Sequence, residues 1–546
     1  MKRLVLGAMT LSAAGCSDDI LDLQPLSQYS DALVWNDLNL VQAYVNPLYN
    51  SIRGLNNAGS IHVSFLDYAG YADESYNRHN YGGTNALYSG AWNAGNFGSQ
   101  IWNNRYDMIQ RLNIFFERIG DVPGDDALRT RLMGEARFLR AYYYAELAKH
   151  YGDVPLITDP FELGDDYAAG IGRTPFDDVV QWVTSELDQA VTELPSQSEQ
   201  PDSDLGRATT GAALAVKADL LLYAASPLHN SGGDLAKWTA ASNAARAVID
   251  LGEYSLFQGD YYDLTMGSFW NSEIIFGRIY AGLYNTPNSE VWLMTNGFGG
   301  WSAYTPQQQF VDAYRMANGL PITDPASGYD PDNPYVGREA RFYGTILHDG
   351  AVSRGRELEF WYDDEGQGGR DTGHGIQPWN ASLTGHAFRK FHDEERDLAA
   401  GRAGFRDRVW PTFRLSEMYL SYAEAQYELG NDGVARDYLN DVRTRPTAGL
   451  PPSTAAGPAL MDDIREERRI ELALESKRYF DLLRWQLAEE YLNDPARGVN
   501  ITRHADGTRS YEYFELRDRV WNPAYYFWPI PESEMQRTDL PQNPGY

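Results

Sequence analysis

Apolar residues recur every three to four positions in several stretches of the chain. The clearest example is 412–430, TFRLSEMYLSYAEAQYELG, whose apolar stripe contains Leu415, Met418, Tyr419, Tyr422, Ala423, Gln426 and Leu429. This spacing predicts an amphipathic helix that ends at Gly430. Similar patterns predict helices at 36–53, 101–119, 128–151, 174–194, 208–250 (a pair) and 459–491. The last range alternates charges of both signs, which favours a solvated or internally paired face.

Two of these segments resemble tetratricopeptide-like helix pairs. After Gly430, a second helix begins near Val434 and is closed by Pro446, with Ala435 and Tyr438 facing inward. The small alanine lets the two helices approach, and the tyrosine fills the groove between them. Trp238, Ala241 and Ala245 take the equivalent packing positions in 208–250.

Three consecutive tyrosines, Tyr142 to Tyr144, lie in FLRAYYYAELAKHYGDVPLIT, 138–158. Consecutive residues on a helix point about 100° apart, so these rings cannot form one flat platform. Tyr143 shares a helix face with Leu139 and Leu147. We therefore predict that this aromatic cluster packs inside the protein.

Two tracts, about 56–100 and 258–405, lack sustained periodicity. Both are rich in Gly, Asn, Asp and aromatic residues, and neither is simple enough in composition to be disordered. Loops of this length in an ordered protein are usually functional. The sequence therefore predicts a mainly α-helical scaffold, of the all-α class, that carries long irregular loops.

Composition limits the kinds of ligand. The chain has 546 residues, a formal net charge of −30 and a pI near 4.6. Such a surface disfavours nucleic acid and anionic lipid, because both require clustered Lys and Arg, but it tolerates neutral ligands. Acidic polysaccharides are disfavoured for the same reason, although Arg354, Arg356 and Arg370 form a local group that keeps a uronate open.

The N-terminus has the pattern of a lipoprotein signal. Lys2 and Arg3 precede a short apolar run, and SAAGC, which resembles a bacterial lipobox, ends at Cys16, the one cysteine of the chain. We predict a signal peptide at 1–15, an acylated Cys16 with a tether at 16–35, and a single domain at 36–546. A free cysteine in a tail is the alternative. No later segment has eighteen uninterrupted apolar residues.

The sequence offers no positive sign of catalysis. HExxH, GxSxG and GxxxxGK[ST] motifs do not occur, and the nine histidines lack ligand spacing. The segment DPASGYDPDNPY, 324–335, has aspartates at 324, 330 and 332 but lacks the glycine and the terminal glutamate of an EF-hand at their places. We interpret it as turns, with a calcium site as the alternative. We expect no other cofactor. Paired carboxylates for glycoside hydrolysis also stay open, because their separation cannot be derived from sequence.

Five blocks resemble, in family order, the SusD/RagB-family outer-membrane lipoproteins of Bacteroidetes, and the match runs nearly end to end. The blocks are EARFLRAYYYAELAKHYGDVPLI (135–157), GAALAVKADLLLYAASP (211–227), FRLSEMYLSYAEAQYELG (413–430), REERRIELALESKRYFDLLRW (465–485) and WPIPESEMQRTDLPQNPGY (528–546). An acidic pair after the cysteine, Asp18 and Asp19, is similar to the surface-export signal of such lipoproteins. Two features depart from the family: the signal is short, and Ala13 occupies the position where a lipobox usually has leucine.

The resemblance implies a SusD-like fold with four tetratricopeptide-like helix pairs and a loop-rich ligand-binding side. It implies a non-catalytic, lipid-anchored protein on the cell surface of the outer membrane. Such proteins capture glycans for polysaccharide utilization and pass them to a SusC-like TonB-dependent transporter. Binding of oligopeptides, as in the RagB type, and a surface glycoside hydrolase are the alternatives.

Sugar rings present apolar C–H faces, which aromatic side chains cover, and hydroxyls, which Asn, Gln, Asp and Arg bind. We therefore look for such residues in the irregular tracts. Trp92 and Trp301 come first, because small neighbours in SGAWNAG and FGGWSAY leave a ring uncovered; anchoring of their own loops is the alternative. The other predicted ligand-binding residues are Tyr81, Tyr88, Tyr284, Trp292, Tyr304, Asn80, Asn96, Trp361 and Trp379.

Overall fold

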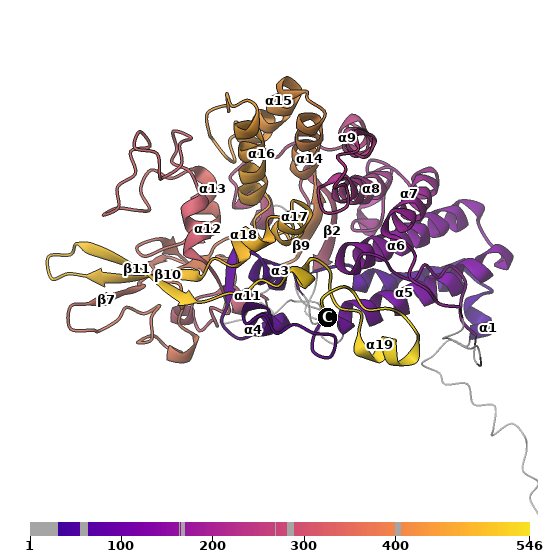
Figure 1. Ribbon diagram of the computed structural model, residues 1–546, viewed down its shortest axis with the longest axis horizontal. Coiled ribbons are helices and arrows are strands. Elements are labelled where there is room, and N and C mark those ends of the chain that lie inside the picture. Colours follow the sequence, from indigo (N-terminus) through magenta and orange to yellow (C-terminus); the bar gives the residue numbers. More distant parts are fainter. Residues whose placement is uncertain are drawn as a thin grey trace, which may run out of the picture.

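The computed structural model describes residues 31–54, 64–162, 164, 170–267, 269–280, 289–398 and 406–546. These residues form a mainly helical protein with a few small sheets (Figure 1), which confirms the predicted fold class. Among the residues described, we find no helix that combines the length and the apolar character needed to cross a membrane.

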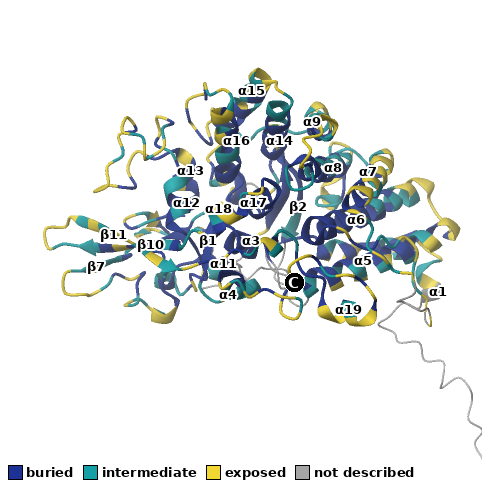
Figure 2. Ribbon diagram, viewed as in Figure 1, coloured by how far each residue is buried: buried dark blue, intermediate teal, exposed yellow. Residues whose placement is uncertain are grey.

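Long helices pack against one another in chain order to form the scaffold (Figure 1). The array contains α5 (Ser99–Arg118), α6 (Asp126–Tyr151), α7 (Phe176–Glu193), α8 (Thr210–Ala225), α9 (Leu235–Asp250), α14 (Leu415–Glu428), α15 (Asp432–Arg443) and α16 (Pro458–Glu471). The α9–α14 contact joins segments on either side of the long 258–405 tract. Buried residues run along α6, β2 and α14, where the elements meet (Figure 2).

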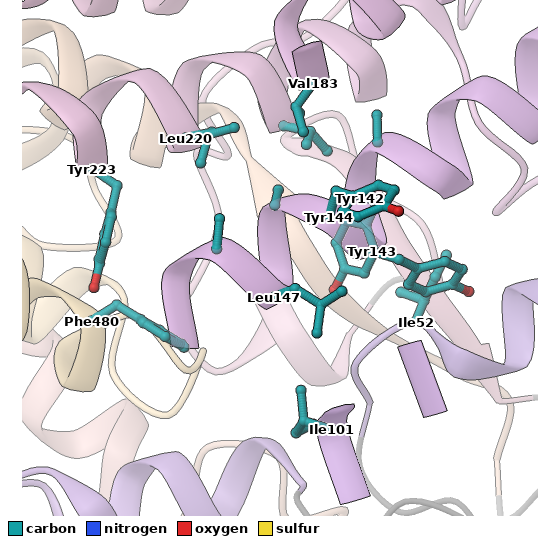
Figure 3. Packing of buried hydrophobic residues seen from close by; sticks show 14 of the residues in the cluster. Ile52, Ile101, Tyr142, Tyr143, Tyr144, Leu147, Val183, Leu220, Tyr223 and Phe480 are labelled. Atoms are coloured by element: carbon teal, nitrogen blue, oxygen red, sulfur yellow. The ribbon is translucent and has the colours of Figure 1, made fainter. Parts of the chain in front are cut away.

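The tyrosine cluster of α6 packs inside, as predicted. Tyr142, Tyr143 and Tyr144 are at most 3% exposed, and Figure 3 shows their rings among other buried side chains. The Tyr144 hydroxyl donates to the Ile157 carbonyl at 2.7 Å, and its ring meets Trp182 edge-on at 5.0 Å. Burial raises the pKa of all three phenols well above the usual range.

The predicted helix at 459–491 is wrong in one respect, because it is broken into three pieces. These are α16, α17 (Arg478–Arg484) and α18 (Ala488–Leu492). Leu474, Ser476 and Gln486 have φ values of 61°, 60° and 57°, which no right-handed helix contains. The left-handed residues stop the helix although none of them is a glycine.

The charges of this region are buried and paired with other elements. Arg414 at the end of β9 is 1% exposed on its side chain, and its guanidinium meets Glu273 at 2.6 Å, Glu471 at 2.6 Å and Glu475 at 2.8 Å. Burial alone would raise the pKa of Glu471, but Arg445 and Arg414 hold it well below its usual value. The network therefore joins the 258–405 tract to the C-terminal segment.

Short elements organise the loop-rich side. The sheets are β1 (Ser75–Asn77) with β3 (Tyr304–Pro306), β2 (Ile274–Tyr280) with β9 (Arg408–Arg414), β4 (Ile346–Leu347) with β8 (Ala387–Phe388), β5 (Val352–Ser353) with β6 (Arg356–Glu357), and β11 (Arg509–Arg517), β10 (Ala496–Arg503) and β7 (Trp361–Asp363) in that order. All pairs are antiparallel except β10 with β7. The remaining helices are α1 (Asp31–Val34), α2 (Leu38–Val45), α3 (Phe65–Tyr71), α4 (Thr84–Tyr88), α10 (Asp263–Met266), α11 (Ser289–Leu293), α12 (Gln308–Ala313), α13 (Ala340–Thr345) and α19 (Glu532–Arg537).

Candidate ligand-binding surface

Three loop segments meet where β1 pairs with β3. The register sets Asn77 opposite Tyr304, and just beyond the sheet the Arg78 amide donates to the Ala303 carbonyl at 2.9 Å. The Arg78 guanidinium donates to the carbonyl of Ala381, which follows the short 3-10 turn Pro378–Asn380. Residues 77–84, 291–304 and 378–381 are thereby brought together from distant parts of the sequence.

Aromatic rings line this junction. His79 lies 5.7 Å from Tyr81 and 6.4 Å from Trp301, and Tyr81 lies 5.1 Å from Trp292, between ring centroids. Trp301 is 38% exposed, and Trp379, on the adjoining turn, is 67% exposed. We call His79, Tyr81, Trp292, Trp301 and Trp379 the aromatic surface.

Local hydrogen bonds fix the segment that carries His79 and Tyr81. The Asn77 side chain accepts from the His79 amide at 3.1 Å and donates to the Tyr81 carbonyl at 2.8 Å. Asn80 adopts a left-handed conformation, with φ 58°, and its side chain accepts from the Asn85 amide at 2.7 Å. Asparagine tolerates this conformation better than most residues, so the turn presents both rings at low conformational cost.

The charged groups near the aromatic surface are already partnered. Arg356 binds Asp371 through two bonds of 2.7 and 2.8 Å, Arg370 binds Glu359 at 3.0 Å, and Arg354 binds Glu290 at 3.1 Å. The three arginines that left a uronate open are thus each engaged by a carboxylate.

Histidine 79 contributes an uncharged ring at neutral pH. Partial burial lowers the pKa of His79 below its ordinary value, and Arg78 acts in the same direction. The His79 Nε2 lies 3.4 Å from the Trp301 carbonyl, so in the neutral ring Nε2 donates there and Nδ1 is the acceptor nitrogen. Sequence reasoning named neither His79 nor Asn77, although both lie in SYNRHNYGG among residues that it did select.

The prediction that Trp92, Tyr88 and Tyr304 offer ring faces to a ligand is wrong, because all three are at most 4% exposed. Trp92 stacks on Phe97 with a centroid distance of 3.5 Å and also touches Trp528. The Tyr88 hydroxyl donates to Gly70, and Tyr304 donates to Asp67 beneath the aromatic surface. The small neighbours of Trp92 predicted an uncovered ring, but Phe97 and Trp528 cover it in the folded protein.

The other predicted residues lie in different settings. Asn96 is exposed but caps its own turn, donating to Ala91 at 2.9 Å and accepting from Asn93 at 2.9 Å. Trp361 lies on β7, where the Arg503 guanidinium covers one ring face at 3.3 Å. Tyr284 and Cys16 lie outside the described residues.

Carboxylates below the surface have structural partners. Asp67 is 2% exposed and completes the cap of α3 with Ser64, and Asp371 is held by Arg356 and Thr295. In the 324–335 segment, Asp330 accepts from the Asp332 amide at 3.0 Å, as an Asx turn does. Within the described ranges, no group of three or more His, Cys, Asp or Glu residues has an arrangement suited to a metal ion.

Comparison with known proteins gives consistent matches over the chain. A model described as the SusD family matches residues 272–546, and a model described as starch-binding associating with outer membrane matches residues 21–222. A SusD-like protein of Bacteroides ovatus is 25% identical over 100% of this chain and 97% of its own length. The starch-binding protein SusD of Bacteroides thetaiotaomicron is 24% identical, covering 81% of this chain and 77% of its own length.

Solved structures agree with these matches. The crystal structure of a SusD-like protein from Bacteroides fragilis has a TM-score of 0.78 and 30% identity, covering 96% of this chain and 100% of that one. A SusD-like carbohydrate binding protein from the same species has a TM-score of 0.79 and 26% identity, covering 93% and 99%.

Proposed function

This chain belongs to the SusD family, and on that premise we propose that it is a non-catalytic glycan-binding protein of the cell surface. The observation that carries the proposal is the aromatic surface, above all the exposed rings of Trp301 and Trp379. Relatives named for starch and carbohydrate binding support the ligand class.

The chemistry of the aromatic surface suits a saccharide. Trp301 and Trp379 offer flat apolar faces for the C–H face of a sugar ring, and each ring loses little rotamer entropy on binding. His79 and Asn80 lie beside them with polar atoms for sugar hydroxyls. A stacking contact contributes about 0.5–1.5 kcal/mol beyond area burial. A small number of such contacts gives an affinity in the micromolar to millimolar range. A polymer that engages several receptors at once binds more tightly, because of the high effective concentration.

A neutral glycan fits better than an acidic one. The nearby arginines are paired with Asp371, Glu359 and Glu290, so their charge is already balanced and attracts a uronate less than a free arginine would. His79 is uncharged at neutral pH and adds no cation. An oligopeptide is the second candidate ligand. The five residues of the aromatic surface include no Lys, Arg, Asp or Glu that could pair with the charged ends of a peptide.

We further propose that Cys16 is acylated and anchors the protein to the outer membrane, where it passes glycan to a SusC-like TonB-dependent transporter. The N-terminal signal pattern and the family described as associating with outer membrane support this location. Cys16→Ser, expressed in a Bacteroidetes host, removes the acylated thiol. The variant should appear in the soluble fraction, whereas retention in the membrane fraction would contradict the anchor.

Affinity electrophoresis against a panel of neutral and acidic polysaccharides tests the proposed function. We expect retardation by at least one neutral glycan and no growth of reducing ends during incubation. Binding to peptides with no glycan retardation would refute the proposal, and new reducing ends would establish a hydrolase instead. Calorimetry with oligosaccharides from the retarding polymer then gives the affinity for the variants below.

A further inference from the structure

The loop that carries Trp301 folds back on the helix before it. Helix α11 leads into residues 294–303, where four successive backbone amides donate to carbonyls in the last turn of that helix or in the two residues that follow it. The bonds run from Gly300 to Thr295 (2.9 Å), Trp301 to Val291 (2.8 Å), Ser302 to Met294 (3.0 Å) and Ala303 to Trp292 (2.7 Å). A Cβ on Gly300 would lie 2.1 Å from the Met294 carbonyl oxygen, so the backbone there sits directly on the helix end.

Ser302 holds an unusual conformation at the centre of this loop. Its φ is 39°, in the left-handed region that residues with a Cβ rarely adopt, and it is 1% exposed. Its hydroxyl has no hydrogen-bond partner in the part of the chain that the structure describes. A strained residue persists only where its surroundings over-determine it, and such residues cluster at ligand sites.

Ser302 lies at the boundary between the exposed indole and the core. Trp301 is 38% exposed, while Ser302, Ala303 and the three residues of β3 are all buried. The left-handed backbone at Ser302 is therefore the point at which the chain leaves the exposed ring and enters the core.

We infer that Ser302 is a positioning residue that holds Trp301 outward before the ligand arrives. Its Cβ removes many backbone conformations that a glycine would sample, and the four amide bonds select the left-handed one. The ring is therefore ordered in the free protein, and binding need not order it. The effect on glycan affinity rests on the proposed function. The ordering of the Trp301 ring by Ser302 concerns the free protein.

Three variants separate the backbone effect from other effects. Ser302→Gly removes the Cβ, whereas Ser302→Ala keeps the Cβ and removes only the unpartnered hydroxyl. Gln486→Gly is the matched control, because Gln486 also has a positive φ (57°) but lies between α17 and α18. We expect Ser302→Gly to weaken glycan binding about three- to tenfold, with the loss in the entropy of binding. The Kd values of Ser302→Ala and Gln486→Gly should stay within about twofold of the wild-type value. The unfolding temperature of Ser302→Gly should not be lower than that of the wild type.

Fluorine NMR of protein labelled with 5-fluorotryptophan reports the ring itself. Trp301→Phe assigns the Trp301 resonance, which should be one narrow line in the wild type and in Ser302→Ala. In Ser302→Gly the line should broaden or split. An unchanged line, or unchanged affinity, in Ser302→Gly overturns the inference. Equal losses in Ser302→Ala and Ser302→Gly overturn it too, because they would make Ser302 an ordinary core residue.

The two proposals fail in different ways. If the wild type binds no glycan, the proposed function fails, and the fluorine spectra still decide whether Ser302 holds Trp301. If glycan binds but the Trp301 line is indifferent to Ser302→Gly, the proposed function stands and the positioning role is refuted.

Discussion

Replacing Trp301 by alanine should weaken glycan binding by about 30-fold. A tryptophan presents at most about 250 Å² of surface, so the 38% exposed fraction corresponds to about 95 Å². If a sugar covers half of that area, the transfer contribution is about 1 kcal/mol at 25 cal/mol per Å². Stacking geometry adds about 1 kcal/mol, and a total near 2 kcal/mol is about 30-fold in Kd.

Calorimetry with a retarding oligosaccharide measures this change directly. Phe269→Ala is the matched control, because Phe269 is also 38% exposed but lies outside the aromatic surface. The control should bind as the wild type does, and both variants should unfold near the wild-type temperature. Trp379→Ala, which removes a 67% exposed ring, should weaken binding to a similar or greater extent. Unchanged affinity in both tryptophan variants would refute the assignment of the aromatic surface.

Three further predictions concern stability. Trp92→Ala should lower the free energy of unfolding by about 3–5 kcal/mol, because it opens a cavity in the core. The glycan affinity of the folded variant should be unchanged. Denaturant unfolding checks the first result and calorimetry on the same sample checks the second. Arg414→Met should lower the free energy of unfolding by about 3–5 kcal/mol, because it removes the cation that contacts Glu273, Glu471 and Glu475 together and leaves three buried carboxylates with fewer charged partners. Urea unfolding measures the change, and a stability within about 0.5 kcal/mol of the wild type, as a surface substitution gives, would contradict it. Burial raises the pKa of Glu74 from 4.5 to about 8. Between these pH values the folded state keeps a proton that the unfolded state loses, so the contribution of Glu74 to the free energy of unfolding falls as the pH rises from 4.5 to about 8. The free energy of unfolding of Glu74→Gln should equal that of the wild type below pH 4.5 and exceed it by about 3–5 kcal/mol above pH 8, as measured by urea unfolding at the two pH values. A difference that stays constant between these pH values would contradict the assigned protonation.

The helical scaffold could be predicted because its signals are local. Periodic apolar residues and their terminating residues predicted α6, α7 and α14 close to their observed bounds. The helix at 459–491 was misjudged because Leu474, Ser476 and Gln486 carry no sequence signal for a left-handed conformation. They hold it because tertiary contacts, such as the bond from the Leu474 amide to Glu74 at 3.1 Å, fix the chain there.

The candidate binding surface could be predicted only in part, because the exposure of each ring depends on partners that are distant in sequence. Trp92 and Trp301 have similar neighbours in sequence, yet one is 4% and the other 38% exposed. Trp92 is covered by Phe97, five residues away, and by Trp528, from the other end of the chain. No local pattern distinguishes a ring that a remote segment covers from one that it leaves open.

The loops that carry the aromatic surface are hydrogen-bonded to one another across long separations in sequence. The Ser75 hydroxyl donates to the Thr305 carbonyl, 230 residues away. Arg78 donates to Ala303, just before β3, and to Ala381, just after the turn Pro378–Asn380. Such links matter because each sugar contact is weak, so a ring that had to be ordered on binding would lose much of its contribution. A receptor that relies on a few stacking contacts therefore needs loops that are fixed in the free state. The long irregular tracts meet that need largely through pairing between segments, since most of their own helices and strands are short.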